Sequence, residues 1–260
     1  MIRSMVIIGD AHAKPGVSNR RFDWLGRYIA DERPDVVVSI GDWFDMPSLC
    51  SYDEGKACFE GRRYKADIAA GVDALARVDR CIRKVNHKRA IARRYKPRLM
   101  MVMGNHDEAR VKRAVQDDAK LEGLISTDDF QLARFGWEST PFLETLTVGG
   151  IAFAHYFTSG IMGRPVGGES PALSLIRKKF SSTCQGHSHL FEMAHRHDPR
   201  WNRVWGIICG CYLDPDQHEE YAGQANNMWS RGLLTLRNVH DGDFESFEWT
   251  GMDALQRRYG

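Results

Sequence analysis

The chain has little net charge and no long hydrophobic segment. Its 36 Lys and Arg residues against 34 Asp and Glu leave a net charge of +2. This balance excludes a strongly basic nucleic-acid coat protein, an acidic tail protein and a chain held open by charge repulsion. No apolar run approaches the ~18 residues of a membrane span, and the first one stops at Ile8, too early for a secretory signal. We therefore expect a soluble, cytoplasmic protein without a membrane partner.

Cysteines are few and have no paired spacing. They are Cys50, Cys58, Cys81, Cys184, Cys209 and Cys211. Without a CxxC pair, neither a zinc ribbon nor a disulfide framework is indicated, and we expect reduced, mostly buried thiols. The chain also lacks an internal repeat, a low-complexity tract and a Ser/Gly linker, while 43% hydrophobic residues suffice for a sizeable core. We expect one domain over residues 1–260.

Short apolar runs rich in β-branched residues predict strands at Met5–Ile8, Val36–Ile40, Leu99–Met103, Ile151–Ala154 and Val204–Cys209. Helical patterns separate the first three. One covers Phe22–Ile29, and a longer one has an apolar face made of Leu75, Val78, Ile82, Val85, Ala92 and Tyr95. This alternation predicts a parallel sheet, and turns at Gly149-Gly150 and Asp241-Gly242 predict antiparallel hairpins in the second half. The fold class is α/β with a mixed core.

Four apolar runs end at or near a glycine that precedes residues able to bind a metal. They continue as Gly9-Asp10-Ala11-His12, Gly41-Asp42-Trp43-Phe44-Asp45, Gly104-Asn105-His106-Asp107 and Gly186-His187-Ser188-His189, and a fifth ends at His155 without glycine. In an open α/β sheet, residues at the carboxyl ends of neighbouring strands converge, and glycine lets the backbone approach closely. Oxygen ligands mixed with imidazoles suit Mn, Fe or Zn better than calcium or an iron–sulfur cluster. The pattern predicts a polynuclear metal site.

The motifs DxH, GDxxD, GNHD, a separate His and GHxH, in this order, resemble those of the calcineurin-like metallophosphoesterases. They extend from Asp10 to His189. The resemblance implies a four-layer α/β/β/α sandwich, with two mixed sheets face to face and helices outside. It implies one metal held by Asp10, His12, Asp42 and His189, and a second held by Asp42, Asn105, His155 and His187, with Asp42 bridging the pair.

Hydrolysis of a phosphoester gains from two divalent cations ~3.5–4 Å apart, which neutralise the ester and acidify a water. We expect Mn²⁺, with Fe, Zn, Ni or Mg as alternatives. A hydroxide bridging the metals would attack in line, and the leaving oxygen would depart with negative charge. The resemblance implies His106 as the general acid that protonates it. Asp45 and Asp107 would then orient His106 or a ligating imidazole.

Each of these residues also has a structural explanation. Asp10 and Asp42 could cap helices, Asn105 could be a turn residue, and Asp107 could stabilise the first turn of a helix. His155 has the weakest support, because the family usually has glycine after this histidine and Tyr156 follows here. A packed core histidine therefore stays an alternative at this position.

The substrate class is indicated by weaker features. Met46-Pro47 follows GDxxD where the protein-phosphatase branch typically has Arg-Gly, which argues against a phosphoprotein, and Trp43-Phe44 resembles the GDLFD pattern of the SbcD nuclease branch. Ten Lys and Arg lie between Arg77 and Arg98 against a single acid. On the predicted helix they crowd the polar face and could bind the phosphates of DNA or RNA, although such a run is usually a solvated face.

Several further residues are candidates for contact with a substrate phosphate or base. Asn105 and Arg164 could reach a substrate phosphate. Bases could stack on some aromatic residues of the last third, although core packing is expected for most of Trp201, Trp205, Tyr212, Tyr221 and Trp229. We expect a phosphodiesterase or nuclease acting on nucleotide or nucleic-acid phosphodiesters. A phosphomonoesterase of the same fold, acting on small molecules or proteins, is the alternative. A catalytically silent protein-binding scaffold is less favoured, because all seven ligand positions and His106 are present.

Overall fold

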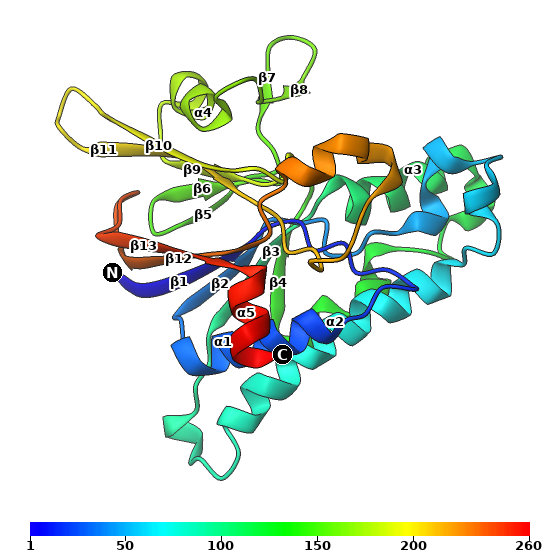
Figure 1. Cartoon of the computed structure of the whole chain (residues 1–260), viewed down its shortest axis with the longest axis horizontal. Coiled ribbons are helices and arrows are strands. Elements are labelled where there is room, and N and C mark those ends of the chain that lie inside the picture. The colour runs from blue at the N-terminus through cyan, green and yellow to red at the C-terminus, as the bar shows by residue number, and fades with distance from the viewer.

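Two β-sheets of mixed strand direction lie face to face at the centre of the chain (Figure 1). One has six strands in the order β13-β12-β1-β2-β3-β4, and the other has five in the order β10-β11-β9-β6-β5. A two-stranded ribbon, β7-β8, stands apart from both. The computed structural model describes residues 1–260 except the side chains of residues 220 and 221.

The six-stranded sheet joins the first and last parts of the chain. Its strands are β1 (Ile2–Ile8), β2 (Val36–Ser39), β3 (Arg98–Val102), β4 (Trp137–Thr140), β12 (Gly232–Val239) and β13 (Ser246–Gly251). The first four run parallel, whereas β12 is antiparallel to β1 and β13 is antiparallel to β12. Runs of Val, Ile, Leu and Met, buried on both faces, explain why this region forms a parallel sheet. The predicted alternation of strands and helices is confirmed.

The second sheet is shorter and richer in antiparallel pairs. It contains β5 (Leu146–Val148), β6 (Ile151–Phe153), β9 (Thr183–Gln185), β10 (Phe191–His197) and β11 (Arg203–Cys209), and the separate ribbon pairs β7 (Thr158–Ser159) with β8 (Arg164–Pro165). β9 is parallel to β6 and β11, while β5-β6 and β10-β11 are antiparallel. The predicted turns at Gly149-Gly150 and Asp241-Gly242 connect β5 to β6 and β12 to β13.

Helices cover the outer faces of both sheets. They are α1 (Arg20–Glu32), α2 (Tyr64–Val85), α3 (Arg110–Asp117), α4 (Pro171–Lys179) and α5 (Met252–Tyr259). Alternate side chains of β1 face different layers. Val6 and Ile8 pack with residues of α1, α2 and α5, whereas Met5 and Ile7 pack against the second sheet. α4 covers the other face of that sheet. The expected four-layer arrangement is confirmed, and no helix of the described residues is long and apolar enough to cross a membrane.

The second predicted helix is shorter than expected. Leu75, Val78 and Ile82 form its buried face as predicted, but α2 ends at Val85. The side chain of Asn86 accepts a hydrogen bond from the Tyr95 N–H and donates one to the Tyr95 carbonyl oxygen, each at 2.7 Å, and so closes a loop over residues 87–94. The prediction that one helical face continues to Tyr95 is therefore wrong, and the basic residues beyond position 85 do not share a helix.

The basic tract, residues 77–98, leads away from the ends of the strands that carry the motifs. At ~1.5 Å per residue, α2 is roughly 33 Å long. The tract then turns so that Arg94 and Lys96 line a cavity with Arg3 and Asp35, at the amino ends of β1 and β2. The motif residues follow the carboxyl ends of these strands. The basic tract and the motif residues therefore lie at opposite ends of the strands of this sheet.

Candidate metal centre

The seven candidate ligands meet where strands of both sheets end. Asp10 follows β1, Asp42 follows β2, Asn105 follows β3, His155 follows β6, and His187 and His189 follow β9. Asp10, His12, Asp42 and His155 are at most 1% exposed. The convergence predicted from the strand order is therefore present, and the most deeply buried polar groups of the chain include these residues.

The first ligand group contains Asp10, His12 and His189. Asp10 Oδ2 lies 3.0 Å from His189 Nε2, and Asp10 Oδ1 accepts a hydrogen bond of 2.9 Å from the His187 N–H. His12 Nε2 lies 4.0 Å from Asp10 Oδ2 and 3.7 Å from Asp42 Oδ2. His12 thus faces the carboxylates of both Asp10 and Asp42.

The second group is centred on His155. Its Nε2 lies 3.3 Å from Asp42 Oδ2, 2.8 Å from Asn105 Oδ1 and 3.2 Å from His187 Nδ1. Its Nδ1 lies 2.8 Å from the carbonyl oxygen of Ile40, a contact that places the proton on Nδ1 and leaves Nε2 as the inward-facing nitrogen. Asp42 Oδ2 lies between His12 and His155, as a bridging ligand requires. His155 is therefore part of the cluster, and the ring of Tyr156 packs 4.7 Å from that of His187.

Glycines leave room for the carboxylates. A Cβ on Gly186 would lie 2.3 Å from Asp10 Oδ1, and one on Gly104 would lie 2.0 Å from Asp42 Oδ1. The close approach expected of these glycines is therefore present. The ligands themselves also have unusual backbones, because the φ angles are in the left-handed region at His12 (43°), Asp42 (47°), His187 (65°) and His189 (60°). Such conformations are costly for residues with a Cβ and gather at functional sites.

The carboxylates stay charged although they are buried. Burial raises the pKa of the Asp42 carboxyl, but the neighbouring imidazoles, His155 first, outweigh burial and hold that pKa well below its usual range. Burial lowers the pKa of His155, yet the carboxylates of Asp42 and Asp10 raise it to about 10. Burial and the neighbouring His155 lower the pKa of His187 to about 4. The centre therefore attracts positive charge.

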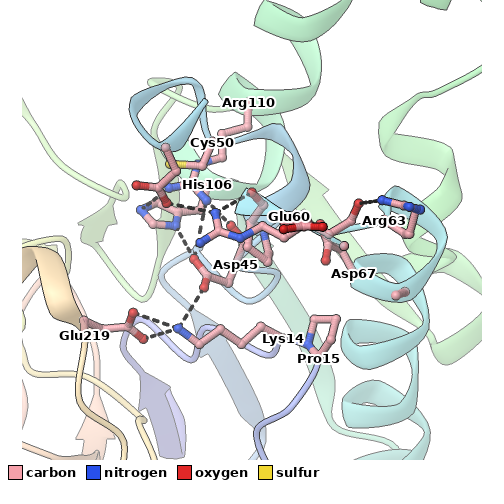
Figure 2. Close-up of a pocket in the computed structure, with 15 residues that line it drawn as sticks. Lys14, Pro15, Asp45, Cys50, Glu60, Arg63, Asp67, His106, Arg110 and Glu219 are labelled. Carbon is pink, nitrogen blue, oxygen red and sulfur yellow. Dashed lines mark hydrogen bonds and ion pairs between the residues drawn. The ribbon is translucent and has the colours of Figure 1, made fainter. Parts of the chain in front are cut away.

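His106 is held by a chain of polar contacts beside the two groups (Figure 2). Its Nδ1 lies 2.7 Å from Asp45 Oδ1, and its N–H donates a hydrogen bond of 2.7 Å to Asp42 Oδ1. Lys14 Nζ lies 3.2 Å from Asp45 Oδ2 and 2.5 Å from Glu219 Oε1. Asp45 thus holds the His106 ring on one side and shares the ammonium group of Lys14 with Glu219 on the other.

Two predicted site residues lie elsewhere. Asp107 does not contact an imidazole; its carboxylate accepts hydrogen bonds from the N–H groups of Phe44, at 2.7 Å, and Gly104, at 3.0 Å. It therefore ties the loop after β3 to the loop after β2, and burial raises its pKa to about 7. Arg164 is exposed on the β7-β8 ribbon and lines no cavity beside His106. The ribbon carries it away from the strand ends (Figure 1).

Two of the five aromatic residues named as candidate base contacts, Trp205 and Tyr212, are buried core residues. Trp205 stacks on Phe244, with ring centroids 4.4 Å apart. The ring of Trp229 packs against His189, and Trp201 is exposed between β10 and β11. The side chain of residue 221 lies outside the described residues.

Comparison with known proteins agrees with this centre. The sequence profile of the calcineurin-like phosphoesterases matches residues 4–223. The chain belongs to this family. It is a metal-dependent phosphoester hydrolase with the mixed α/β fold of the calcineurin-like phosphoesterases. Among curated proteins, no sequence matches it.

Two of the solved structures similar to the chain match it over nearly its whole length. YfcE, a phosphoesterase from E. coli, is 12% identical, with 94% of this chain and 98% of that chain covered and a TM-score of 0.41. A second structure is 10% identical, with 97% and 100% covered and a TM-score of 0.43. Because both TM-scores are below 0.5, the family assignment rests on the profile match and the motifs.

The calcineurin-like phosphoesterases use divalent metals, and the donor set fits such ions. The ligand atoms of Asp10, His12 and His189 all lie within 4.8 Å of one another, as do those of Asp42, His155 and His187. His12 Nε2, which faces both carboxylates, is buried without a hydrogen-bond partner, and this is costly unless a cation takes its lone pair. Nitrogen and oxygen donors without thiolate suit Mn, Fe or Zn.

Three polar residues of the site were missed by sequence reasoning. Lys14 and Glu219 are 205 positions apart, so no local pattern reveals their ion pair. Arg110 lies one helical turn after His106, and that spacing could have pointed to it. Its guanidinium Nη2 is 3.4 Å from His106 Nε2.

A fourth missed residue supports the loop after β1. Arg21 is completely buried and donates hydrogen bonds to the carbonyl oxygens of Ala11, Ser18 and Tyr212, at 2.7, 2.8 and 3.1 Å. Burial lowers its pKa to about 10. These contacts fix the DxH loop against the segment that follows β11, so Arg21 acts on the centre through the backbone.

Proposed function

We propose that this phosphoesterase hydrolyses phosphodiesters, and that the substrate is a nucleotide or a nucleic acid. The observation that carries the proposal is a pair of cavities that meet at His106 and Arg110. One, of about 430 Å³, opens toward Lys14 and Glu219. The other, of about 550 Å³, opens toward Tyr52 and is lined in part by Asn105. A phosphodiester carries a substituent on each side of its phosphorus, whereas a monoester needs only one such space.

The second cavity suits a nucleotide. Tyr52 is 80% exposed and offers a ring face on which a base can stack. Arg110 and Arg113 line the same cavity and supply positive charge for a further phosphate, whereas Lys56 is paired there with Asp53. Both volumes are in the range of small-ligand sites. A nucleic acid would use the same cavity for one nucleotide beside the scissile bond.

Two divalent ions, Mn²⁺ in our proposal, would be held by the two ligand groups and would supply charge neutralisation and an acidified water. The chain provides the rest. Asp45 holds His106 Nδ1, so that Nε2 is turned toward the cavities and can carry the proton for the leaving oxygen. Lys14 compensates the charge of Asp45 and keeps it in place. The Asp42 carboxylate fixes the backbone of His106.

A substrate panel with added Mn²⁺ tests the proposal. We expect faster hydrolysis of bis-(p-nitrophenyl) phosphate than of p-nitrophenyl phosphate, and turnover of cyclic nucleotides or DNA. Tyr52→Ala should lower nucleotide turnover while sparing bis-(p-nitrophenyl) phosphate. Faster hydrolysis of the monoester would instead identify a phosphomonoesterase. The cytoplasmic location expected from the sequence stays a prediction.

A further inference from the structure

Arg110 occupies an unusual position between the two cavities. It is the first residue of α3 and follows a single π-helical turn, Asn105–Ala109, whose end is closed by the Arg110 N–H donating to the Asn105 carbonyl oxygen. Such turns are rare and frequently mark functional sites. The turn places the Arg110 side chain over His106, where it is 18% exposed and lines both cavities.

The charge of Arg110 is only partly compensated. Nη1 donates to the carbonyl oxygens of Asp45 and, at 3.3 Å, Met46. Asp45 Oδ1, at 3.5 Å, supplies the one carboxylate that pairs with this guanidinium among the described residues. That carboxylate already faces Lys14, His106 and, at 3.4 Å, His12. A guanidinium with an open side and a shared partner is well placed to bind an anion.

The second nitrogen of this guanidinium faces the nitrogen of His106 that the reaction needs. His106 Nδ1 lies against the Asp45 carboxylate, which can only accept, so Nδ1 carries the hydrogen of this contact. The neutral ring then accepts at Nε2 from Arg110 Nη2, over 3.4 Å. While this contact exists, Nε2 cannot face a leaving oxygen. Arg110 must therefore turn away from His106 before the ester is cleaved.

We propose that Arg110 is the substrate-binding arginine of this enzyme: Nη2 leaves His106 and donates to a non-bridging oxygen of the scissile phosphate. Its partners in the resting site are weak or shared, and the phosphate would enter where both cavities meet. Nη1 keeps its carbonyl contacts and so limits the movement to one end of the side chain. Binding of the phosphate thereby frees His106 Nε2 to take up a proton from solvent, and this is the proton that it donates to the leaving oxygen. This inference rests on phosphoester hydrolysis at His106, and not on the preference for diesters.

The test compares Arg110→Gln, Arg110→Lys and Arg110→Ala with Lys112→Gln in the metal-loaded enzyme. Lys112 lies on the same helix, is 63% exposed and pairs with Glu108, so its variant removes the same charge without touching a cavity. The measurements are KM and kcat for bis-(p-nitrophenyl) phosphate, the inhibition constant of inorganic phosphate, bound metal and Tm. Arg110→Ala is also assayed with added guanidinium chloride at low concentration.

Loss of a charge-assisted hydrogen bond weakens binding by about ten- to a hundredfold. We expect Arg110→Gln and Arg110→Ala to raise both KM and the inhibition constant of phosphate by this factor, with bound metal unchanged. Arg110→Lys should recover part of the loss. Free guanidinium should restore part of the activity of Arg110→Ala and leave Lys112→Gln unaffected, a rescue that a purely structural brace would not show.

Unchanged KM and phosphate inhibition in Arg110→Ala would overturn the proposal, whether or not its Tm falls. The absence of rescue by guanidinium together with a lowered Tm would assign Arg110 to support of the Asp45 loop alone. If the wild-type enzyme with metal hydrolysed no phosphoester at all, the assignment of the reaction to this centre would fail first. The two failures are therefore distinguishable.

Discussion

Replacing Gly186 with alanine tests whether the Asp10 carboxylate holds a metal. The added Cβ would lie 2.3 Å from Asp10 Oδ1 and 3.2 Å from Ile40 Cγ2, whereas ordinary contacts begin at 3.4 Å. Gly186 has no left-handed φ, so alanine meets no backbone strain there, and the effect is steric. The carboxylate must therefore retreat by about 1 Å from its place beside His189.

The expected magnitude follows from this displacement. A misplacement of about 1 Å at a reacting centre costs on the order of a hundredfold in rate. We therefore expect kcat/KM for bis-(p-nitrophenyl) phosphate to fall by about that factor. Overpacking of this kind costs about 1–3 kcal/mol of folding free energy, a loss that a domain of this size tolerates. The ligand group of Asp42, His155 and His187 is affected only through the His187 N–H, which donates to the displaced oxygen, so the metal bound with Asp10 should be weakened most.

The assay combines metal titration by calorimetry, metal content after gel filtration, and steady-state kinetics. Gly167→Ala is the matched control, because its Cβ would meet no atom within 4 Å and its φ is not left-handed. We expect this control to retain wild-type metal content and rate. Two tightly bound metals and an unchanged kcat/KM in Gly186→Ala would refute the assignment of Asp10 as a ligand.

Three further variants test other parts of the site and the basic tract. Asp42→Asn should abolish activity and lower metal content, because the charged bridge serves both groups; near-normal turnover with two metals retained would contradict bridging. His106→Ala should keep its metals and lose more activity toward esters with poor leaving groups than toward p-nitrophenyl esters, as rate measurements on both will show; an equal loss would speak against proton donation. Changing Arg83, Lys84, Lys88 and Arg94 of the basic tract to glutamine should leave hydrolysis of bis-(p-nitrophenyl) phosphate intact, because the tract lies at the other end of the strands from the metal centre. Any DNA or RNA binding should weaken, and the slope of log affinity against log salt should flatten by about 0.7–0.9 per phosphate contact. A loss of small-diester hydrolysis would contradict this placement of the tract.

The parts of the fold that were predictable depend on short-range patterns. Buried runs such as Val36–Ser39 and the turn at Gly149-Gly150 specify their own structure over a few residues. The metal-binding motifs follow because each lies directly after a strand, so that strand order alone brings them together. The helix prediction failed where a side chain outside the apolar pattern determines the structure. The apolar spacing continues after Val85, but the hydrogen bonds between Asn86 and the backbone of Tyr95 close a loop and end the helix.

The residues around His106 show what no local pattern carries. Lys14 is opposite Glu219 only because the segment after β11 folds over the loop after β1. Asp107 was expected to orient an imidazole, yet the tight turn after β3 directs its carboxylate to two backbone N–H groups. The left-handed backbone of the ligands depends on the packing of both sheets. Such features follow from tertiary structure and have no signature of their own in sequence.

The place of β12 beside β1 has a consequence for the order of events during synthesis. Every metal-binding motif is complete once His189 has been made, but β1 then has a partner on one side only. Its other edge stays open until Gly232–Val239, which lies more than forty residues after His189, has also been made. An apolar strand with a free edge is prone to pair with other chains. The nascent protein therefore passes through an interval in which the open edge of this buried, apolar strand needs protection, so a chaperone would affect the yield of the protein more than its activity.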